Sequence, residues 1–349
     1  MSTSSFAKLP FASDYMESAH PSVLAALAQT AGQPMSGYGT DHMSEEAREL
    51  IRHACDAPQA EVHFLSGGTQ ANATMIDVLL APYQGVVAAD TGHVASHEAG
   101  AIEAGGHKVL TLPARDGKIS AAQIEGLATQ YLKDENRDHM VMPGLVYLSQ
   151  PTELGTIYTL EELEDISHAA HAHGMHVYVD GARLAYALAS TQDNASLADI
   201  ARLADAFYIG GTKCGALFGE AVVVPQAGLV PHLFTLIKQH GALLAKGWAI
   251  GAQFGALLRD DLYLRIGEGA NQQAARIAQA LAERGFLAAT PQTNQVFAIL
   301  PNETYRALSE RVDLSFWERP DEAHTMVRIA TSWATRDEDV DALVALLRA

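Results

Sequence analysis

Short apolar runs alternate with amphipathic stretches along most of this chain of 349 residues. The apolar runs predict strands at residues 61–65, 86–89, 107–112, 145–149, 176–180, 206–209 and 221–224. Helical periodicity predicts helices between them, at residues 45–54 with Ser44 as N-cap, after Gly67 and Gly68, at 120–132 and at 159–174. Strands separated by helices favour right-handed crossovers. The pattern therefore predicts an α/β fold with a mostly parallel seven-stranded sheet and helices on both faces.

The pattern changes after residue 230. A long helical region at 232–250 is followed by helix 271–284, strands 295–300 and 326–331, and helix 336–348. These elements predict a smaller α+β unit at the C-terminal end. We expect an N-terminal arm at residues 1–20, a large domain at 21–255 and a small domain at 256–349.

The composition and charge of the chain limit the kinds of partner that it can bind. Charged residues make up 18% of the chain, below the usual value of about 25%, which indicates much buried surface, including surface against other subunits. The 41 acidic and 23 basic residues give a net charge of -18, which repels nucleic acid and anionic lipid. The longest uncharged apolar-leaning run, at 221–237, contains Pro225 and Pro231 and is too short for a membrane span. We expect no nucleic-acid or membrane partner.

The cysteine content and the N-terminal residues indicate the cellular compartment. Cys55 and Cys214 lie far apart in sequence, so we expect neither a disulfide framework nor a cysteine metal site. The N-terminal stretch has no apolar run of the kind found in export signals. Together these features predict a cytoplasmic protein.

In open α/β sheets, ligands bind beyond the carboxyl ends of the strands. After the strand at 61–65 comes a glycine-rich turn that includes Gly68 and Thr69 and opens a helix. Glycines allow close backbone approach, and a helix N-terminus attracts anions, so this turn is a candidate phosphate site. An ordinary structural turn explains a lone glycine-rich segment equally well.

Two further strand ends carry charged residues. Asp180 ends the strand at 176–180, and a buried carboxylate there needs a cation. It could bind a ligand, or it could have a structural role in an ion pair with Arg183 or as a helix cap. Lys213 lies among glycines and apolar residues after the strand at 206–209. Partial burial would lower its pKa toward a neutral, nucleophilic amine, although a surface lysine in a turn is the alternative.

Taken together, Asp-Gly-Ala-Arg at 180–183 and Gly-Gly-Thr-Lys at 210–213 resemble the fold-type I enzymes that use pyridoxal 5′-phosphate. Over nearly its whole length the chain resembles the threonine aldolases of the β-eliminating lyase group. The stretches that carry this resemblance are FASDYMESAHP, SGYGTDH, HFLSGGTQANA, TGHVASHEAGAIEAGGH, YLSQPTELGT, VDGARLA, YIGGTKCGALFGEA and VRIATSWAT.

The resemblance implies roles for the cofactor-binding residues. Lys213 matches the Schiff-base lysine, and Asp180 matches the carboxylate that keeps the pyridine nitrogen protonated. Gly68 and Thr69 match the phosphate-binding turn. His93 matches the histidine that stacks on the cofactor ring. The spacing of His93 and His97 also suits a metal pair, but the resemblance favours stacking, and we expect no metal.

The resemblance also assigns the substrate-binding residues. Arg183, Arg328 and Ser13 match the groups that hold the substrate carboxylate, with Arg183 also next to the cofactor. Tyr38 matches a tyrosine supplied across a subunit interface, in a homotetramer built as a dimer of dimers. Glu153 stands where many relatives have a histidine, which leaves the general base open.

Lys246 has two interpretations. It could reach a phosphate of a neighbouring subunit, or it could be a surface lysine on a helix that lays its aliphatic stem along the protein.

The implied reaction is cleavage of L-threonine or L-allo-threonine to glycine and acetaldehyde. Phenylserine-type substrates, β-elimination, racemisation and transamination would use the same Lys213 and Asp180 and stay open as alternatives. A cofactor-binding module without activity is a further alternative, which the full set of Lys213, Asp180, Arg183 and Arg328 argues against. The preference between the two threonine epimers cannot be derived from the pattern.

Overall fold

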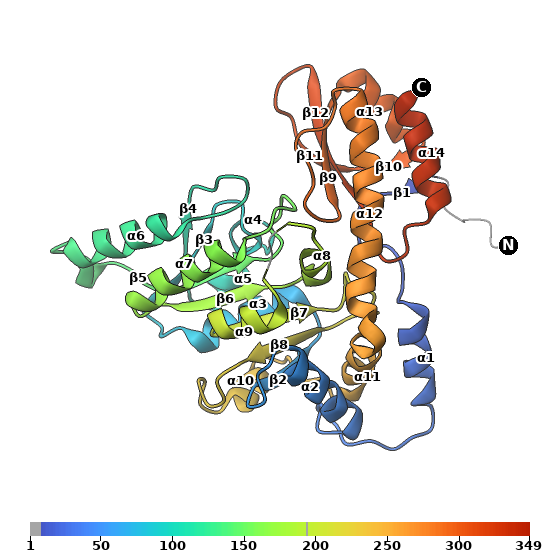
Figure 1. Cartoon of the computed structure of the whole chain (residues 1–349). Helices are drawn as coiled ribbons and strands as arrows, with labels where there is room; N and C mark the ends of the chain where they lie inside the picture. The colour runs from blue at the N-terminus through green and yellow to red at the C-terminus, as the bar shows by residue number, and fades with distance from the viewer. Residues whose placement is uncertain (1–7, 193–194) are drawn as a thin grey trace.

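The computed structural model describes residues 8–192 and 195–349. In this part of the chain, seven strands form a central sheet in the order β2-β8-β7-β6-β5-β3-β4 (Figure 1). Strands β7, β6, β5, β3 and β4 run parallel, and β8 runs antiparallel to both β2 and β7. A second, antiparallel sheet has the order β11-β12-β9. The predicted α/β fold, with a mostly parallel sheet and a smaller α+β unit, is confirmed.

The strands have the following bounds: β1 Leu9–Pro10, β2 Glu61–Leu65, β3 Gln84–Ala89, β4 Val109–Leu112, β5 Met142–Ser149, β6 His176–Asp180, β7 Ala206–Gly210, β8 Glu220–Val224, β9 Gln295–Pro301, β10 Val312–Asp313, β11 Ser315–Glu318 and β12 His324–Ala330. Strands β3, β5, β6, β7 and β8 are almost entirely buried, as expected when helices cover both faces, whereas the edge strand β4 has no buried residue.

The α-helices have the following bounds: α1 Pro21–Gln29, α2 His42–Ala54, α3 Gly68–Leu79, α4 His93–Ser96, α5 Ala101–Ala104, α6 Ala121–Lys133, α7 Leu160–Ala172, α8 Leu184–Leu188, α9 Leu197–Leu203, α10 Leu233–Gln239, α11 Trp248–Leu257, α12 Leu262–Glu283, α13 Asn302–Ser309 and α14 Asp337–Arg348. Short 3-10 helices lie at Arg137–His139 and Arg259–Asp261.

Several predicted boundaries were wrong. Helix α2 begins earlier than expected, because the carboxylate of Asp41 accepts the backbone N–H of Ser44 and takes the N-cap position in its place. The region 232–250 is not one helix, since a turn at 240–247 separates α10 from α11. Helix α12 begins at Leu262 rather than near 271. Helix α7 begins where it was predicted, with a capping box formed by Thr159 and Glu162.

Apolar side chains form separate cores on the two faces of the central sheet. Helices α2, α7 and α11 contribute to one face, and α3 and α10 contribute to the other. A further core lies between α12, α14 and the small sheet. Figure 1 shows α12 running from the helices beside the central sheet to the small sheet. Because α12 packs in both regions, the domain boundary at residue 255 stays a prediction.

The described part of the predicted N-terminal arm, from residue 8 to 20, is anchored to the small sheet's side of the molecule. Strand β1 pairs in parallel with β10, and Phe11 is fully buried in the core beneath the small sheet. The backbone N–H of Phe11 donates to Asp313, and the carbonyl of Phe11 accepts from Ala330. Residues 1–7 of the arm lie outside the described residues.

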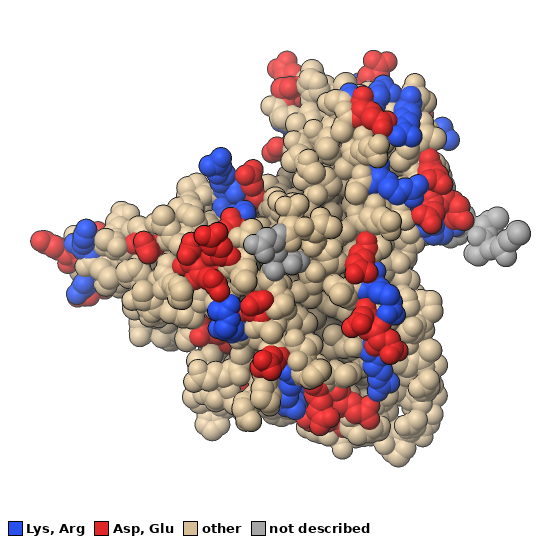
Figure 2. Space-filling view, viewed as in Figure 1, with Lys and Arg blue, Asp and Glu red and all other residues tan. Residues whose placement is uncertain are grey.

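Acidic and basic side chains are interspersed on the face shown in Figure 2, and no continuous basic patch is visible there. Among the helices of the described residues, none combines the length and the apolar character that a bilayer span requires.

Candidate active site

The carboxyl ends of the parallel strands β5, β6 and β7 lie at one edge of the central sheet. Ser149 ends β5, and its register partner Asp180 ends β6. Lys213 follows the end of β7 by three residues. Asp180 is close enough to influence the charge of the Lys213 amine. The fold therefore brings the two residues of the sequence prediction to the same edge, where α/β sheets bind ligands.

The Asp180 carboxylate is buried and receives hydrogen bonds from neutral groups. Oδ2 accepts from Tyr147 Oη at 2.6 Å and from Asn72 Nδ2 at 2.8 Å. Oδ1 accepts from Tyr208 Oη at 2.5 Å and from the backbone N–H of Ala182 at 3.0 Å. Burial by itself raises the pKa of Asp180, but these donors outweigh it and hold the pKa below its usual value. The carboxylate is thus kept ionised.

Arg183 does not pair with Asp180, as one interpretation of the sequence allowed. Its Nε donates to Asp14 Oδ2 at 2.6 Å, and its Nη2 donates to Asp14 Oδ1 at 3.0 Å, in a two-pronged ion pair. Burial disfavours the Asp14 charge, but Arg183 lowers the pKa of Asp14 to about 2. Within residues 8–192 and 195–349, Asp180 is left without a cation within ion-pairing distance.

The backbone around Lys213 is held by groups that the sequence did not point to. The buried carboxylate of Glu220, at the start of β8, accepts from the N–H of Gly211 and from Thr212 Oγ1. Tyr186 Oη donates to the carbonyl of Lys213 at 2.6 Å. Burial first, and then the charge of Arg183, lower the pKa of the Lys213 amine. These effects favour the neutral amine that attacks a carbonyl group.

The glycine-rich turn lies at the N-terminus of α3, as predicted. Gly67 occupies the N-cap position and provides no side-chain cap, so the N–H groups of the first turn at Gly68 and Thr69 stay available to an anion. A Cβ atom at Gly68 would approach the Tyr208 hydroxyl to 2.9 Å. Glycine is needed there because Tyr208 must reach Asp180.

A buried line of hydrogen bonds connects Asp180 to His93. The Asn72 amide donates to Asp180 and also to Glu98 Oε1, the latter at 2.7 Å. The same Glu98 oxygen lies 2.7 Å from His93 Nδ1. In the imidazole tautomer that donates from Nδ1 to this oxygen, Nε2 of His93 is left as an acceptor. Glu98 therefore orients the imidazole that the sequence prediction places on the cofactor.

Glu153 lies beside the same histidine. Its Oε1 accepts from the backbone N–H of His93 at 2.9 Å and from Ser149 Oγ at 2.6 Å. Burial is the largest influence on its carboxyl group and raises the pKa of Glu153 above its usual value. A raised pKa makes a carboxyl group better able to hold and exchange a proton.

Arg328 and Ser13 lie together on the other side of the site, with groups that lack partners. Arg328 Nη2 donates to the carbonyl of Ala12 at 3.4 Å, and Nη1 donates to Gln295 Oε1 at 3.2 Å. Among the described residues, Arg328 Nε and Ser13 Oγ are buried without a hydrogen-bond partner. Burial, followed by the charge of Arg183, lowers the pKa of Arg328. An unpartnered guanidinium nitrogen next to an unpartnered hydroxyl group fits an incoming carboxylate.

Tyr38 and Lys246 lie apart from these strand ends, on the outer side of α2 and α11. Tyr38 is 42% exposed, and Lys238 Nζ lies 4.0 Å from the centre of its ring. Lys246 is exposed in the turn before α11 rather than on a helix. The backbone N–H of Tyr38 donates to Ala245, so the two predicted interface residues occupy neighbouring segments.

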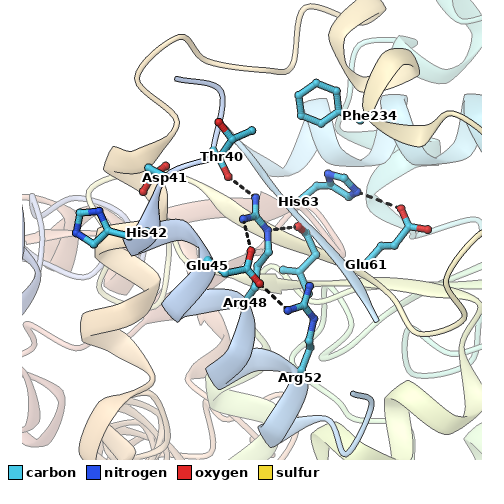
Figure 3. A pocket seen from close by; sticks show the side chains of 11 residues that line it. Thr40, Asp41, His42, Glu45, Arg48, Arg52, Glu61, His63 and Phe234 are labelled. Carbon is cyan, nitrogen blue, oxygen red and sulfur yellow. Dashed lines mark hydrogen bonds and ion pairs between the residues drawn. The ribbon is translucent and has the colours of Figure 1, made fainter. Parts of the chain in front are cut away.

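A cavity of about 480 Å³ lies next to the Tyr38 loop, against the edge strand β2 (Figure 3). Arg48 and Arg52 project into it from α2 and donate to the carbonyls of Val62 and Ala60. Arg48 also donates to Glu45 and to the carbonyl of Gly39. None of the predicted site residues lines this cavity. Its arginines stabilise the edge strand and the Tyr38 loop.

Several residues of the candidate site were missed by sequence reasoning. They are Asp14, Asn72, Glu98, Tyr147, Tyr208 and Glu220. All six stand within the stretches that carried the resemblance, so a search for polar residues in those stretches could have found them. Tyr147 is the hardest to find from the pattern, because it lies within an apolar strand.

Comparisons with known proteins agree on one relationship. The chain matches the β-eliminating lyase family over residues 11–322. It is 31% identical to a low specificity L-threonine aldolase of Pseudomonas aeruginosa, over 97% of this chain and 96% of that protein. It is 43% identical to a threonine aldolase of Leishmania major with a TM-score of 0.94, over 97% of this chain and 98% of the other.

More distant structures share the fold alone. One is a serine palmitoyltransferase from S. paucimobilis that was solved with bound pyridoxal phosphate and myriocin. It is 16% identical with a TM-score of 0.68, over 98% of this chain and 86% of the other.

Proposed function

This chain belongs to the threonine aldolases of the β-eliminating lyase family, and from that premise we propose that it cleaves L-threonine and L-allo-threonine to glycine and acetaldehyde. It is a lyase that depends on pyridoxal 5′-phosphate. The proposal concerns which residues of this chain carry out the reaction and which substrates they accept.

One observation carries the assignment of residues. Asp180 is buried and ionised, and neutral donors surround it rather than a cation. An unpaired buried charge costs several kcal/mol unless it is hydrogen-bonded or meets a counter-charge. A protonated pyridine nitrogen supplies such a counter-charge. The carboxylate therefore fits the cofactor that the family uses.

The other groups at this edge fit the remaining parts of pyridoxal phosphate. Lys213 provides the amine that binds its aldehyde, the α3 N-terminus at Gly68 and Thr69 holds its phosphate, and His93 covers its ring. When bound, the cofactor withdraws electrons from the bonds around the α-carbon of an attached amino acid. Asp180 sustains this withdrawal by keeping the ring nitrogen charged.

The substrate carboxylate is held by Arg328, Ser13 and Arg183. Arg328 Nε and Ser13 Oγ, which lack partners among the described residues, donate to it. Arg183 has Nε and Nη2 committed to Asp14, which leaves Nη1 as the nitrogen that can donate to the substrate carboxylate. Holding the carboxylate fixes the direction of the Cα–Cβ bond, and such positioning contributes up to roughly 7 to 11 kcal/mol to catalysis.

Proton transfer falls to His93, Glu153 and Lys213. The β-hydroxyl proton must leave as the Cα–Cβ bond breaks. Either His93 Nε2 or the neighbouring Glu153 accepts this proton. The raised pKa of Glu153 suits it to hold that proton. Lys213, with its lowered pKa, returns a proton to the α-carbon so that glycine can leave.

The experiment that tests this assignment combines product analysis with cofactor trapping. Purified protein incubated with each threonine epimer should release acetaldehyde and glycine in equal amounts. Keto acid and ammonia would indicate elimination, and an inverted amino acid would indicate racemisation. Borohydride should fix the cofactor to the peptide that contains Lys213. Lys213→Ala should lower turnover by about a thousandfold or more, whereas exposed Lys133→Ala should not. A Lys213→Ala protein that still cleaves threonine at the normal rate would exclude the scheme.

We propose further that the chain assembles as a homotetramer, a dimer of dimers whose sites are shared. Tyr38 is 42% exposed and Phe234 is 44% exposed, although both are large and apolar. Exposed aromatic residues of this kind favour contact with another subunit. Mass measurement in solution tests the assembly, and mixing Tyr38→Ala protein with Lys213→Ala protein tests sharing, because activity should return if each subunit completes its neighbour.

Residence in the cytoplasm stays a prediction that rests on the sparse cysteine usage. Cell fractionation with an antibody to the chain tests it.

A further inference from the structure

Trp317 occupies an irregular position in the small sheet. Ser315 pairs with Arg328 and Phe316 with Val327, but the next pair joins Glu318 to Met326. Trp317 is therefore the extra residue of a β-bulge on β11. Bulges bend the strand locally and redirect a side chain, and they occur often beside active sites.

The bulge directs the indole of Trp317 into a cluster of rings. The Phe297 ring packs edge-on against it, with centroids 5.0 Å apart. The His97 ring lies nearly parallel to it, with centroids 6.2 Å apart and planes at 24°. The guanidinium carbon of Arg328 lies 5.9 Å from the centre of the indole. The neighbouring Phe316 is 53% exposed and is absent from these ring contacts of the described residues.

His97 extends this cluster to the other side of the site. Its ring stacks on His93, with centroids 5.9 Å apart and planes at 24°. A continuous row of flat groups therefore leads from His93 through His97 and Trp317 to Arg328. The two histidines belong to the α4 segment beside the central sheet, and Trp317 and Arg328 belong to the small sheet. The row spans the boundary between the two parts of the protein.

We propose that His97 and Trp317 form the wall against which the β-substituent of the substrate lies, and that they limit its size. This inference rests on the proposed function, because it uses the positions of the cofactor and of the substrate carboxylate. The amino acid must lie between Lys213 and His93 at one end and Arg328 at the other. Its amino group is directed to Lys213 and its carboxylate to Arg328, which leaves the third substituent of the α-carbon facing the row between them.

The chemistry of the wall suits a small apolar group. Burial first, and then the neighbouring His93 and Arg328, lower the pKa of His97, which favours the neutral ring with its weakly polar face. The His97 and Trp317 rings already pack on each other, so the space that they occupy is closed to a bulky group. A methyl group, as in threonine, fits against two flat rings, whereas a phenyl group would have to displace them.

The test compares two substrates in variants of the wall. Trp317→Ala, and independently His97→Ala, should raise the ratio of kcat/KM for phenylserine over threonine by about tenfold or more, because a deleted ring makes room for the phenyl group. Phe316→Ala is the matched control on the same strand and should leave the ratio unchanged. Trp317→Phe, which keeps an aromatic ring, should give an intermediate ratio and guards against loss of folding in the alanine variants.

Glycine binding distinguishes two roles of His97 and Trp317, direct contact with the β-substituent and structural support of Arg328. Glycine has no β-substituent, so its dissociation constant, measured from the change in cofactor absorbance, should stay within about twofold of the original in both alanine variants. A glycine affinity that falls in parallel with threonine turnover would show that the row merely positions Arg328, and it would overturn the proposal. An unchanged or lowered substrate ratio in both variants would also overturn it. Absence of threonine cleavage in the unmodified protein would instead refute the proposed function.

Discussion

The Asp180 end and the Arg328 end of the candidate site differ in how their charges are satisfied. Hydrogen bonds from Tyr147, Tyr208, Asn72 and the backbone, all of 3.0 Å or less, surround Asp180. Arg328 makes only long contacts, at 3.2 and 3.4 Å, and its Nε has no partner in the described structure. Hydrogen bonds within the protein satisfy the charge of Asp180, whereas the charge of Arg328 is only partly satisfied.

The pKa shifts at the two ends support this contrast. The pKa of Asp180 is lowered although burial opposes it, so the protein itself stabilises the charged form. The pKa of Arg328 is lowered because burial and Arg183 disfavour its charge. An arginine that the protein destabilises gains most from a ligand carboxylate. The cofactor end is therefore preorganised on rigid strands, and the substrate end is completed by the substrate.

Removal of the Asp180 charge at the cofactor end should have the largest effect on turnover. Asp180→Asn should lower kcat by roughly 10² to 10³-fold, because the amide cannot keep the ring nitrogen protonated and its NH₂ group would face existing donors. Steady-state turnover of threonine measures the effect. Asp205→Asn, which alters a carboxylate just before β7 at the opposite edge of the sheet, should leave kcat unchanged. Normal kcat in Asp180→Asn would contradict the assigned role.

A smaller effect is expected at the substrate end. Arg328→Lys keeps a positive charge but loses the planar fork, so one charge-assisted hydrogen bond of about 1.5 to 3 kcal/mol should disappear. KM for threonine should rise roughly 10- to 100-fold, with a smaller change in kcat. Arg276→Lys on α12, where the arginine pairs with Asp337 at the surface, is the control. Equal KM values in the two variants would argue against carboxylate binding by Arg328.

The smallest effect on turnover should come from Glu220, which lies beneath the Lys213 loop and contacts no predicted ligand. Burial raises the pKa of Glu220 from 4.5 to about 7. Between these values the folded protein holds a proton that the unfolded chain releases, so the free energy of unfolding falls as pH rises. Above about pH 7 the loss amounts to about 3 kcal/mol.

Glu220→Gln should remove this pH dependence, while kcat changes only a few-fold. Denaturant unfolding from about pH 4.5 to 8 measures it. Exposed Glu161→Gln should keep the original pH profile. If Glu220→Gln retains the original slope with pH, the buried carboxyl group is not its source.

Strand ends were the most predictable part of the site. Asp180 and Lys213 follow apolar runs whose length and spacing mark parallel strands, so their common edge follows from topology. The hydroxyl and amide donors to Asp180 could not be derived in this way. Tyr147, Tyr208 and Asn72 lie 33, 28 and 108 residues from it, and only the packed sheet brings them to one carboxylate.

The remaining differences between prediction and structure have separate physical causes. Asp41 and Ser44 are both good N-caps, and the sequence pattern does not decide which of them begins α2. Trp317 lies in a bulge, which interrupts the alternation of exposed and buried residues on which strand prediction depends. The ion pair of Arg183 with Asp14 joins residues 169 positions apart, and hydrophobic periodicity along the sequence cannot predict such a contact.

The pairing of β1 with β10 sets an order of events during synthesis. Leu9 and Pro10 find their partners only when Val312 and Asp313 have left the ribosome, and Phe11 also needs Ala330. Asp14, a few residues further on, also accepts a hydrogen bond from Asn294, which is synthesised much later than Arg183. The surroundings of the Arg183–Asp14 ion pair are therefore completed only after residues far beyond the central sheet have been synthesised.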